Sequence, residues 1–307
     1  MTLHPQVQAL IDSELAAPLA DGPADLAAQR AGYLETALER GGALEPVDAG
    51  EDVVIPIEGD ARIAARVYTP QGGPRVPGTL VWFHGGGWVI GDLEGFDWAA
   101  RSLANASGAE LVSVDYRLAP EHPFPAGARD ADAALRRALD RSGAVAIGGD
   151  SAGGNLAAVA ARHARDEGIE LRAQLLVYPA TDATHSGGSY RDEDNPMLSM
   201  AAMEACWKAY RADADEKDPD VSPLHAEDLA GIAPTLVAVA GHDVLRDDGI
   251  AYAEALQRAG VEVQLDVYDD MAHGFLRWAG VVDRTRELLD SLGAFAAQRL
   301  AGQVSRA

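Results

Sequence analysis

The sequence contains very little cysteine and lysine, and no long apolar run. Its only cysteine, Cys206, excludes an internal disulfide, and its position beside Trp207 in an apolar segment indicates a buried thiol rather than a nucleophile. No stretch approaches the roughly 20 apolar residues of a membrane-spanning helix. Residues 1–14 show neither the basic nor the apolar region of a secretory signal, so we expect a cytoplasmic protein.

Positive charge is also scarce. The chain has 25 basic and 48 acidic residues, which gives a net charge of −23. Such a chain repels nucleic acid and anionic membranes, so we expect neither as a partner. We interpret the charge as a strongly solvated acidic surface; the alternative is electrostatic steering of cationic substrates. With 307 residues, 48% of them hydrophobic, the chain can form a sizeable core, and we expect one α/β domain with an insertion.

The hydrophobic pattern alternates between strand and helix over most of the chain. Runs of strand length occur at residues 52–58, 62–69, 79–83, 110–114, 144–147, 173–177, 235–240 and 262–268. Helical patterns occur at residues 95–106, 125–141, 155–165, 247–259 and 282–300. The first two runs read as a hairpin. This order predicts a mostly parallel eight-stranded sheet with helices on both faces and an antiparallel start.

Two segments do not fit this alternation. Before the first strand, residues 6–17 and 24–39 read as two helices, and we expect them to pack on the core as part of a lid. Between about residues 180 and 232 the sequence is polar and rich in turn residues, with one short helix near 199–210. About 50 residues without a regular pattern inside a domain indicate a functional insertion.

A serine stands at a sharp turn between a strand and a helix. Ser151 occupies the centre of Gly149-Asp150-Ser151-Ala152-Gly153, after the apolar run at 144–147 and before the helical pattern at 155–165. The flanking glycines remove side chains that would collide with the neighbouring strand and helix. Such a turn lifts the hydroxyl clear of the sheet, so we predict Ser151 as a nucleophile.

A serine nucleophile needs a base and an orienting carboxylate, and both are expected beyond the carboxyl ends of the strands. Of the eight histidines, we choose His273, which follows the last strand in a short loop with a glycine beside it. For the acid, Asp243, Asp247 and Asp248 compete. Asp247 is explained as an N-cap or first-turn acid of the next helix, so we favour Asp243, which lies nearer the strand end.

Three glycines follow the buried strand at 79–83. The amides of Gly85, Gly86 and Gly87, with that of Ala152, are predicted to donate to the oxygen that becomes negative when Ser151 attacks a carbonyl. His84 is expected to anchor this loop through hydrogen bonds. The spacing fits neither a metal site nor a nucleotide-binding loop, so we expect no metal.

Five motifs resemble the hormone-sensitive-lipase family, the bacterial family IV carboxylesterases of the α/β-hydrolase superfamily. They are HGGGW at 84–88, DYRLAPEHPFPA at 115–126, GDSAGG at 149–154, Tyr178-Pro179 and HGF at 273–275. The resemblance implies an α/β-hydrolase fold and a serine carboxylesterase that acts on short- to medium-chain acyl esters without a cofactor. It also implies a helical cap of residues 1–45 and 181–231 on a catalytic domain of residues 46–180 and 232–307. Members of the family commonly form homodimers.

One departure from the family keeps alternatives open. The family has Asp-Pro-Leu at the acid, whereas this chain has Asp243-Val244-Leu245, so Asp247 stays a competitor. The same three groups would also serve an amidase, a deacetylase or a lactonase, because the cap and the acyl pocket set selectivity. A non-catalytic ligand-binding protein is a further alternative, since the plant gibberellin receptors resemble this family but lack the catalytic histidine. The intact His273 argues against it.

Overall fold

A central eight-stranded sheet organises the molecule, and the computed structural model describes residues 2–13, 25–57, 59, 61–191 and 196–302. The strands are β1 (Ala49–Pro56), β2 (Arg62–Thr69), β3 (Thr79–Phe83), β4 (Glu110–Asp115), β5 (Val145–Asp150), β6 (Ala173–Val177), β7 (Thr235–His242) and β8 (Val263–Ala272). Their spatial order is β1-β2-β4-β3-β5-β6-β7-β8. β2 pairs antiparallel with β1 and β4, and every other pairing is parallel. The predicted eight-stranded, mostly parallel sheet is confirmed.

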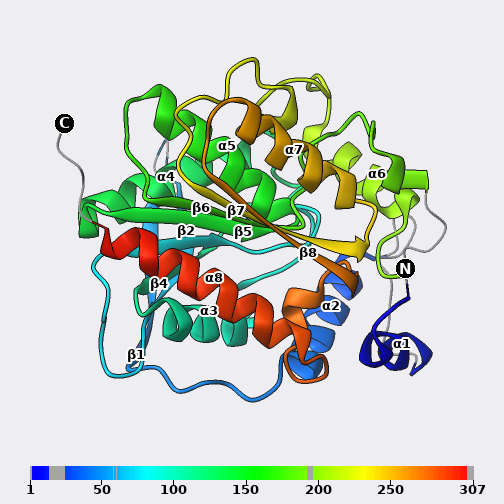
Figure 1. Cartoon of the computed structure of the whole chain (residues 1–307), viewed down its shortest axis with the longest axis horizontal. Helices are drawn as coiled ribbons and strands as arrows, with labels where there is room; N and C mark the ends of the chain where they lie inside the picture. The colour runs from blue at the N-terminus through cyan, green and yellow to red at the C-terminus, as the bar shows by residue number, and fades with distance from the viewer. Residues whose placement is uncertain (1, 14–24, 58, 60, 192–195, 303–307) are drawn as a thin grey trace.

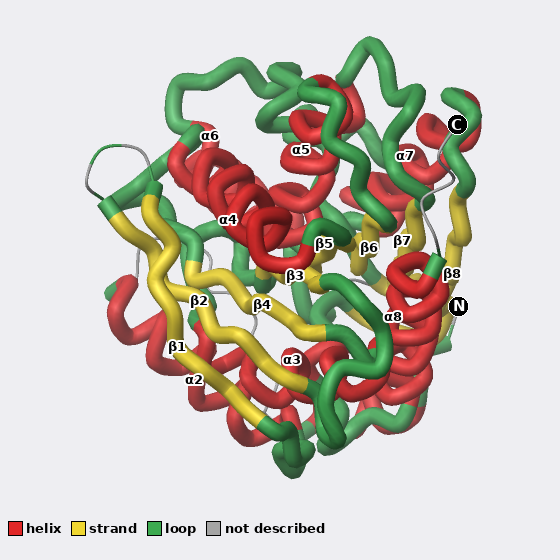
Figure 2. Tube along the Cα trace, turned by 90° about the vertical axis from the view of Figure 1, so that its left-hand side faces the viewer, coloured by secondary structure: helices red, strands yellow, loops and turns green. Residues whose placement is uncertain are grey.

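Helices cover both faces of the sheet (Figures 1 and 2). One face carries α3 (Leu93–Ser107) and α8 (Arg284–Ala301), and the other carries α4 (Ala126–Ser142), α5 (Ala152–Asp166) and α7 (Arg246–Arg258). The middle strands β3, β5, β6 and β7 are buried along their whole length, which explains their near-continuous apolar sequence. Within the described residues, no helix has the length and apolar character needed to cross a bilayer.

The segments outside the strand–helix alternation gather near the ends of β7 and β8 (Figure 1). They contain α1 (Pro5–Asp12), α2 (Leu26–Gly41) and α6 (Met200–Arg211). The first predicted helix, 6–17, is shorter in the structure: α1 ends at Asp12 with Ser13 as its C-cap, and residues 14–24 lie outside the described part of the chain. Residues of α2 and α6 line one pocket together with Ser151, so both segments border the candidate site.

β5 and β8 extend furthest beyond the carboxyl ends that the hydrophobic pattern indicates. β5 continues through Gly148-Gly149-Asp150. Glycine at 148 lets the neighbouring strands pack closely here, because a side chain at this position would collide with Trp82 and Leu175. β8 continues through two acidic residues to Ala272, with an irregular register beside β7. These extensions bring Ser151 and His273 directly to the strand ends.

Candidate active site

Ser151 lies in a strained backbone conformation between β5 and α5. Its φ of 55° and ψ of −119° are unusual for a residue with a side chain. Its amide donates to Val177 O at 2.8 Å, and its carbonyl accepts from Asn155 N at 3.1 Å. Side chains at Gly149 or Gly153 would collide with backbone atoms around the turn. The glycines therefore permit the turn that presents the serine hydroxyl to the pocket, as the sequence predicts.

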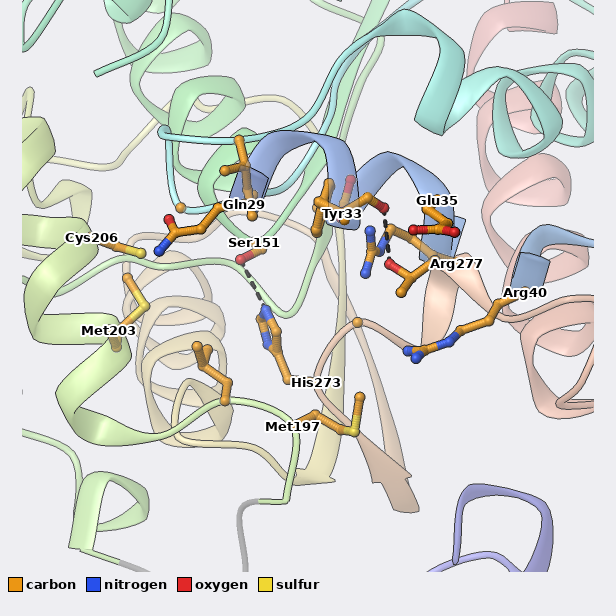
Figure 3. Close-up of a pocket in the computed structure, with 18 of the residues that line it drawn as sticks. Gln29, Tyr33, Glu35, Arg40, Ser151, Met197, Met203, Cys206, His273 and Arg277 are labelled. Carbon is orange, nitrogen blue, oxygen red and sulfur yellow. Dashed lines mark hydrogen bonds between the residues drawn. The ribbon is translucent and has the colours of Figure 1, made fainter. Parts of the chain in front are cut away.

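His273 connects Ser151 to Asp243. Its Nε2 lies 3.0 Å from Ser151 Oγ (Figure 3), and its Nδ1 lies 2.7 Å from Asp243 Oδ2. Asp243 is buried, and its Oδ1 accepts from Leu245 N at 2.9 Å. An ionised carboxylate only accepts hydrogen bonds, so Nδ1 carries the proton and Nε2 accepts from the serine hydroxyl. In this order of contacts the imidazole can remove the hydroxyl proton when Ser151 attacks.

The competing acid Asp247 makes other contacts. It lies in the first turn of α7, where its Oδ2 accepts from Ser189 N at 2.9 Å and its Oδ1 from Arg246 Nε at 3.0 Å. It thus fastens the insertion to α7, and the structure brings Asp243 rather than Asp247 to His273.

Asp248, the third candidate acid, is also engaged elsewhere. Its Oδ2 accepts from Thr181 N and Asp182 N, each at 3.1 Å, and from the Tyr190 hydroxyl at 3.1 Å. Burial raises the pKa of Asp248 well above its ordinary value, and the hydrogen bonds from Thr181 and Tyr190 oppose this rise. Asp248 therefore also fastens the insertion.

The glycine loop after β3 presents free amides to the pocket. Gly86 and Gly87 adopt φ values of 127° and 58°, which favour glycine. Both line the same pocket as Ser151. In the described part of the chain, their amides and that of Ala152 have no hydrogen-bond acceptor. These N–H groups are therefore available to an oxygen bound beside Ser151.

Gly85 differs from its two neighbours. Its amide donates to Asp150 Oδ1 at 2.9 Å and is not available to a ligand, so the prediction of Gly85 as an oxyanion donor is wrong. Asp150 is buried next to Ser151; burial raises its pKa, and the positive charge of Arg277 opposes the rise. The sequence contains Asp150 within the serine motif, but no local pattern connects it with the glycine loop 65 residues earlier.

His84 holds the glycine loop as predicted. Its Nδ1 donates to Gly85 O at 2.8 Å, and its ring stacks on Tyr116 with centroids 4.5 Å apart. The Tyr116 hydroxyl in turn donates to His84 O at 2.8 Å. Tyr116 belongs to the motif at 115–126, and its role as a support for the loop is visible only in the fold.

Other histidines that we considered as the base are held by carboxylates elsewhere. His163 lies between Asp132 and Asp220, at 3.0 Å and 2.9 Å. His225 Nε2 lies 2.9 Å from Asp182 Oδ1. Neither ring contacts Ser151, so both belong to the packing of the insertion and of the helices beside it.

The pocket above Ser151 has a volume of about 480 Å³. In Figure 3 the sulfur atoms of Met203 and Cys206, from α6, lie on one side of Ser151 and His273, and Arg40, from the end of α2, lies on the other. Cys206 is buried, as expected, and burial raises the pKa of its thiol to about 12. The pocket residues of α2 were not predicted, because helical periodicity shows which face is buried but not that it faces a cavity.

Known proteins similar to this chain share its fold. A family model described as the alpha/beta hydrolase fold matches residues 80–277. The chain is 43% identical over 253 residues to the carboxylic ester hydrolase LipN of Mycobacterium tuberculosis, covering 76% of this chain and 67% of LipN. It is 35% identical over 265 residues to an ethyl acetate hydrolase of Pseudomonas putida, covering 82% and 83% of the two chains. A hyperthermophilic esterase from Pyrobaculum calidifontis matches 98% of this chain and 100% of its own, with a TM-score of 0.91 and 36% identity.

Proposed function

This chain belongs to the hormone-sensitive-lipase-like family of α/β-hydrolases and is a carboxylic ester hydrolase, and we propose that it hydrolyses short- to medium-chain acyl esters through Ser151, His273 and Asp243. The observation that carries this proposal is the unbroken chain of hydrogen bonds from the Ser151 hydroxyl through His273 to Asp243. The pocket beside these three residues is partly lined by sulfur-containing and aliphatic side chains. Such a pocket suits a short acyl group.

In the acylation step, Ser151 Oγ attacks the ester carbonyl while its proton moves to His273 Nε2. The carbonyl oxygen becomes an oxyanion, which accepts hydrogen bonds from the amides of Gly86, Gly87 and Ala152. Asp243 stabilises the imidazolium that forms. When the tetrahedral intermediate collapses, the C–O bond to the alcohol breaks and His273 returns the proton to the leaving oxygen, which leaves an acyl group on Ser151.

Deacylation repeats these steps with water. His273 removes a proton from a water molecule as its oxygen attacks the acyl carbonyl, and the same amides hold the second oxyanion. Collapse then breaks the bond to Ser151 Oγ, and His273 returns the proton to the serine. The products are a carboxylic acid and an alcohol, and the protein ends the cycle in its starting state.

We further propose that residues 1–45 and 181–231 act together as a cap that sets selectivity over a catalytic domain of residues 46–180 and 232–307. The supporting observation is that α2 and α6 line the same pocket as Ser151. An amidase, a deacetylase or a lactonase could use the same catalytic groups. Two relatives are named an ethyl acetate hydrolase and an arylesterase, and these names support the hypothesis that this chain acts on esters.

The test is the hydrolysis of p-nitrophenyl butyrate by Ser151→Ala and His273→Ala. Each change removes one member of a unit, so we expect kcat to fall by about 10⁴- to 10⁶-fold in either variant. His122→Ala, at an exposed histidine, is the control and should keep the wild-type rate. Near wild-type hydrolysis by Ser151→Ala or His273→Ala would refute the proposal.

A further inference from the structure

Arg40 is a buried cation without a side-chain partner among the residues that the structure describes. It lies in the last turn of α2 and lines the pocket, yet the residue is only 3% exposed. Its Nε and Nη2 are buried and, among the described residues, have no hydrogen-bond acceptor. A buried charged donor without a partner is costly, so native proteins rarely keep one unless something else supplies the partner.

The two unpaired nitrogens of Arg40 indicate the shape of that partner. Nε and Nη2 lie on one edge of the planar guanidinium, where their N–H bonds point in parallel. That edge matches the two oxygens of a carboxylate, which it can bind in a bidentate manner. The same edge would leave one of its N–H groups unused on a single hydroxyl or carbonyl oxygen.

A second guanidinium lines the same pocket. Arg277 stacks on the Tyr33 ring, 3.9 Å from its centroid, and its Nη1 is also buried without a partner in the described part of the chain. The positive charge of Arg277 opposes the burial that raises the pKa of Asp150, so Arg277 has a structural role as well. Arg40 has no such role, which makes it the stronger indication of a ligand.

The nearby acids do not neutralise this pair. Three acids line the pocket. Asp25 and Glu35 are exposed, and Asp25 caps α2 by accepting from Ala27 N at 3.0 Å; Asp150 is buried and accepts from Gly85 N at 2.9 Å. Among the described residues, no carboxylate oxygen lies within 4.0 Å of a nitrogen of Arg40 or Arg277. In the part of the chain that the structure describes, both guanidiniums therefore line the pocket without a direct ion pair.

A backbone hydrogen bond holds Arg40 in position. Its carbonyl oxygen accepts from Gly280 N at 2.9 Å, which ties the end of α2 to the loop after η3 (Phe275–Arg277). In Figure 3 its side chain reaches from α2 into the pocket, on the opposite side of Ser151 and His273 from Cys206. A molecule that occupies the pocket therefore lies against both Ser151 and Arg40. The Nε and Nη2 atoms of Arg40 are themselves closed to solvent, so the ligand reaches them when the side chain turns toward it.

We propose that the preferred substrates are esters that carry a free carboxylate, such as half-esters of short dicarboxylic acids, with the carboxylate bound by Arg40 and Arg277. This inference rests on the proposed function, because it places the ester carbonyl at Ser151. It gives the buried guanidiniums the partner that the protein does not supply. It also means that the acidic surface does not select cationic substrates at this site.

The experiment compares matched pairs of esters in wild-type enzyme. Monoethyl adipate and ethyl hexanoate differ only by a terminal carboxylate in the acyl part, and 6-acetoxyhexanoate and hexyl acetate differ in the same way in the alcohol part. The measured quantity is the ratio of kcat/KM for the charged ester to that for the neutral ester within each pair. Using a ratio cancels any general change in activity or in the amount of folded protein.

We expect this ratio to fall by about 10- to 100-fold in Arg40→Met for at least one pair, mainly through KM, since a charge-assisted bidentate contact is lost. The ratio for Arg40→Lys should lie between those for wild type and Arg40→Met, because lysine keeps the charge but not the parallel N–H groups. Arg258→Met, at an exposed arginine on α7, is the control and should leave the ratio unchanged.

The outcomes separate this inference from the proposed function. Ratios that are the same in wild type and Arg40→Met for both pairs would overturn the carboxylate site while leaving ester hydrolysis intact. Wild-type enzyme that cleaves none of the four esters would instead overturn the proposed function. A wild-type enzyme that prefers the neutral ester more than tenfold in both pairs would also overturn the inference. If Arg40→Met does not fold, Arg277→Met provides a second variant for the same comparison.

Discussion

The two ends of the pocket leave different kinds of donor unpaired. Beside Ser151, the unpaired donors are neutral backbone amides of Gly86, Gly87 and Ala152. At the α2 end, the unpaired donors are the charged N–H groups of Arg40. Neutral dipoles suit a negative charge that exists only in the transition state, whereas a full cation suits an anion present throughout. Changes at the serine end should therefore act on kcat, and changes at Arg40 should act on KM.

After Ser151→Ala and His273→Ala, the largest effect expected at the serine end comes from changing the carboxylate of Asp243. Asp243→Asn keeps the size of the side chain but favours the wrong tautomer of His273, so kcat should fall by about 10³- to 10⁴-fold. Asp247→Asn is the matched control, because Asp247 contacts Ser189 and Arg246 instead of His273. We expect its kcat to change less than tenfold. A larger loss in Asp247→Asn than in Asp243→Asn would assign the acid to residue 247.

A smaller effect is expected from moving the glycine loop. In Gly87→Ala the new methyl group would collide with Cys206 Sγ, which displaces the amides beside Ser151. Loss of one oxyanion donor costs about 10²-fold in kcat, and we expect a loss of that order. Gly143→Ala is the control: it has a similar φ of 70° but open space around it, so it should cost stability without lowering kcat.

A double variant identifies the cause of that loss. Cys206→Ala removes the sulfur atom that the new methyl group meets, so Gly87→Ala/Cys206→Ala should recover part of the lost kcat. A double variant as slow as Gly87→Ala alone would show that backbone strain, and not the collision with Cys206, moves the loop.

The smallest effect concerns a buried acid away from the pocket. Asp248 Oδ1 has no partner in the described part of the chain, and burial raises the pKa of the carboxyl. In the folded state Asp248 therefore keeps its proton to a higher pH than in the unfolded state. The stability of the wild type falls as the pH rises from the unfolded-state pKa of Asp248 to its folded-state pKa. Asp248→Asn removes that fall, so the free energy of unfolding of the variant should increase relative to that of wild type as the pH rises above about 4, the ordinary pKa of an aspartate.

Denaturant titrations at several pH values measure this difference. The gain should be about 1.4 kcal/mol for each unit by which burial raises the pKa of Asp248. Parallel stability curves for wild type and Asp248→Asn would contradict it. The result also sharpens the comparison with Arg40, since an unpaired buried atom outside the active-site pocket should affect stability but not substrate choice.

The sequence predicts the parts of the site that lie in short motifs. Ser151, His273 and the glycine loop each follow a recognisable strand, so the fold and these positions could be placed before the structure. Asp243 and Asp247 follow the same strand, and only the contact with His273 distinguishes them. The cytoplasmic location, the homodimer and the absence of a nucleic-acid partner stay predictions.

Other parts of the site depend on contacts between segments distant in the sequence. The Gly85 amide is taken by Asp150, and a repeat of glycines does not show which amide is free. The role of Arg40 depends on where α2 lies over the sheet, because the helical pattern alone predicts a buried face and not a pocket wall. Tertiary geometry decides both.

The most direct test is covalent labelling of the nucleophile. Diethyl p-nitrophenyl phosphate transfers its phosphoryl group to an activated serine, and peptide mapping by mass spectrometry locates the adduct. We expect one adduct per chain, on Ser151, formed in step with the loss of ester hydrolysis and absent from Ser151→Ala. Loss of hydrolysis with the label on another residue, or with Ser151 unmodified, would contradict the assignment of Ser151 as the nucleophile.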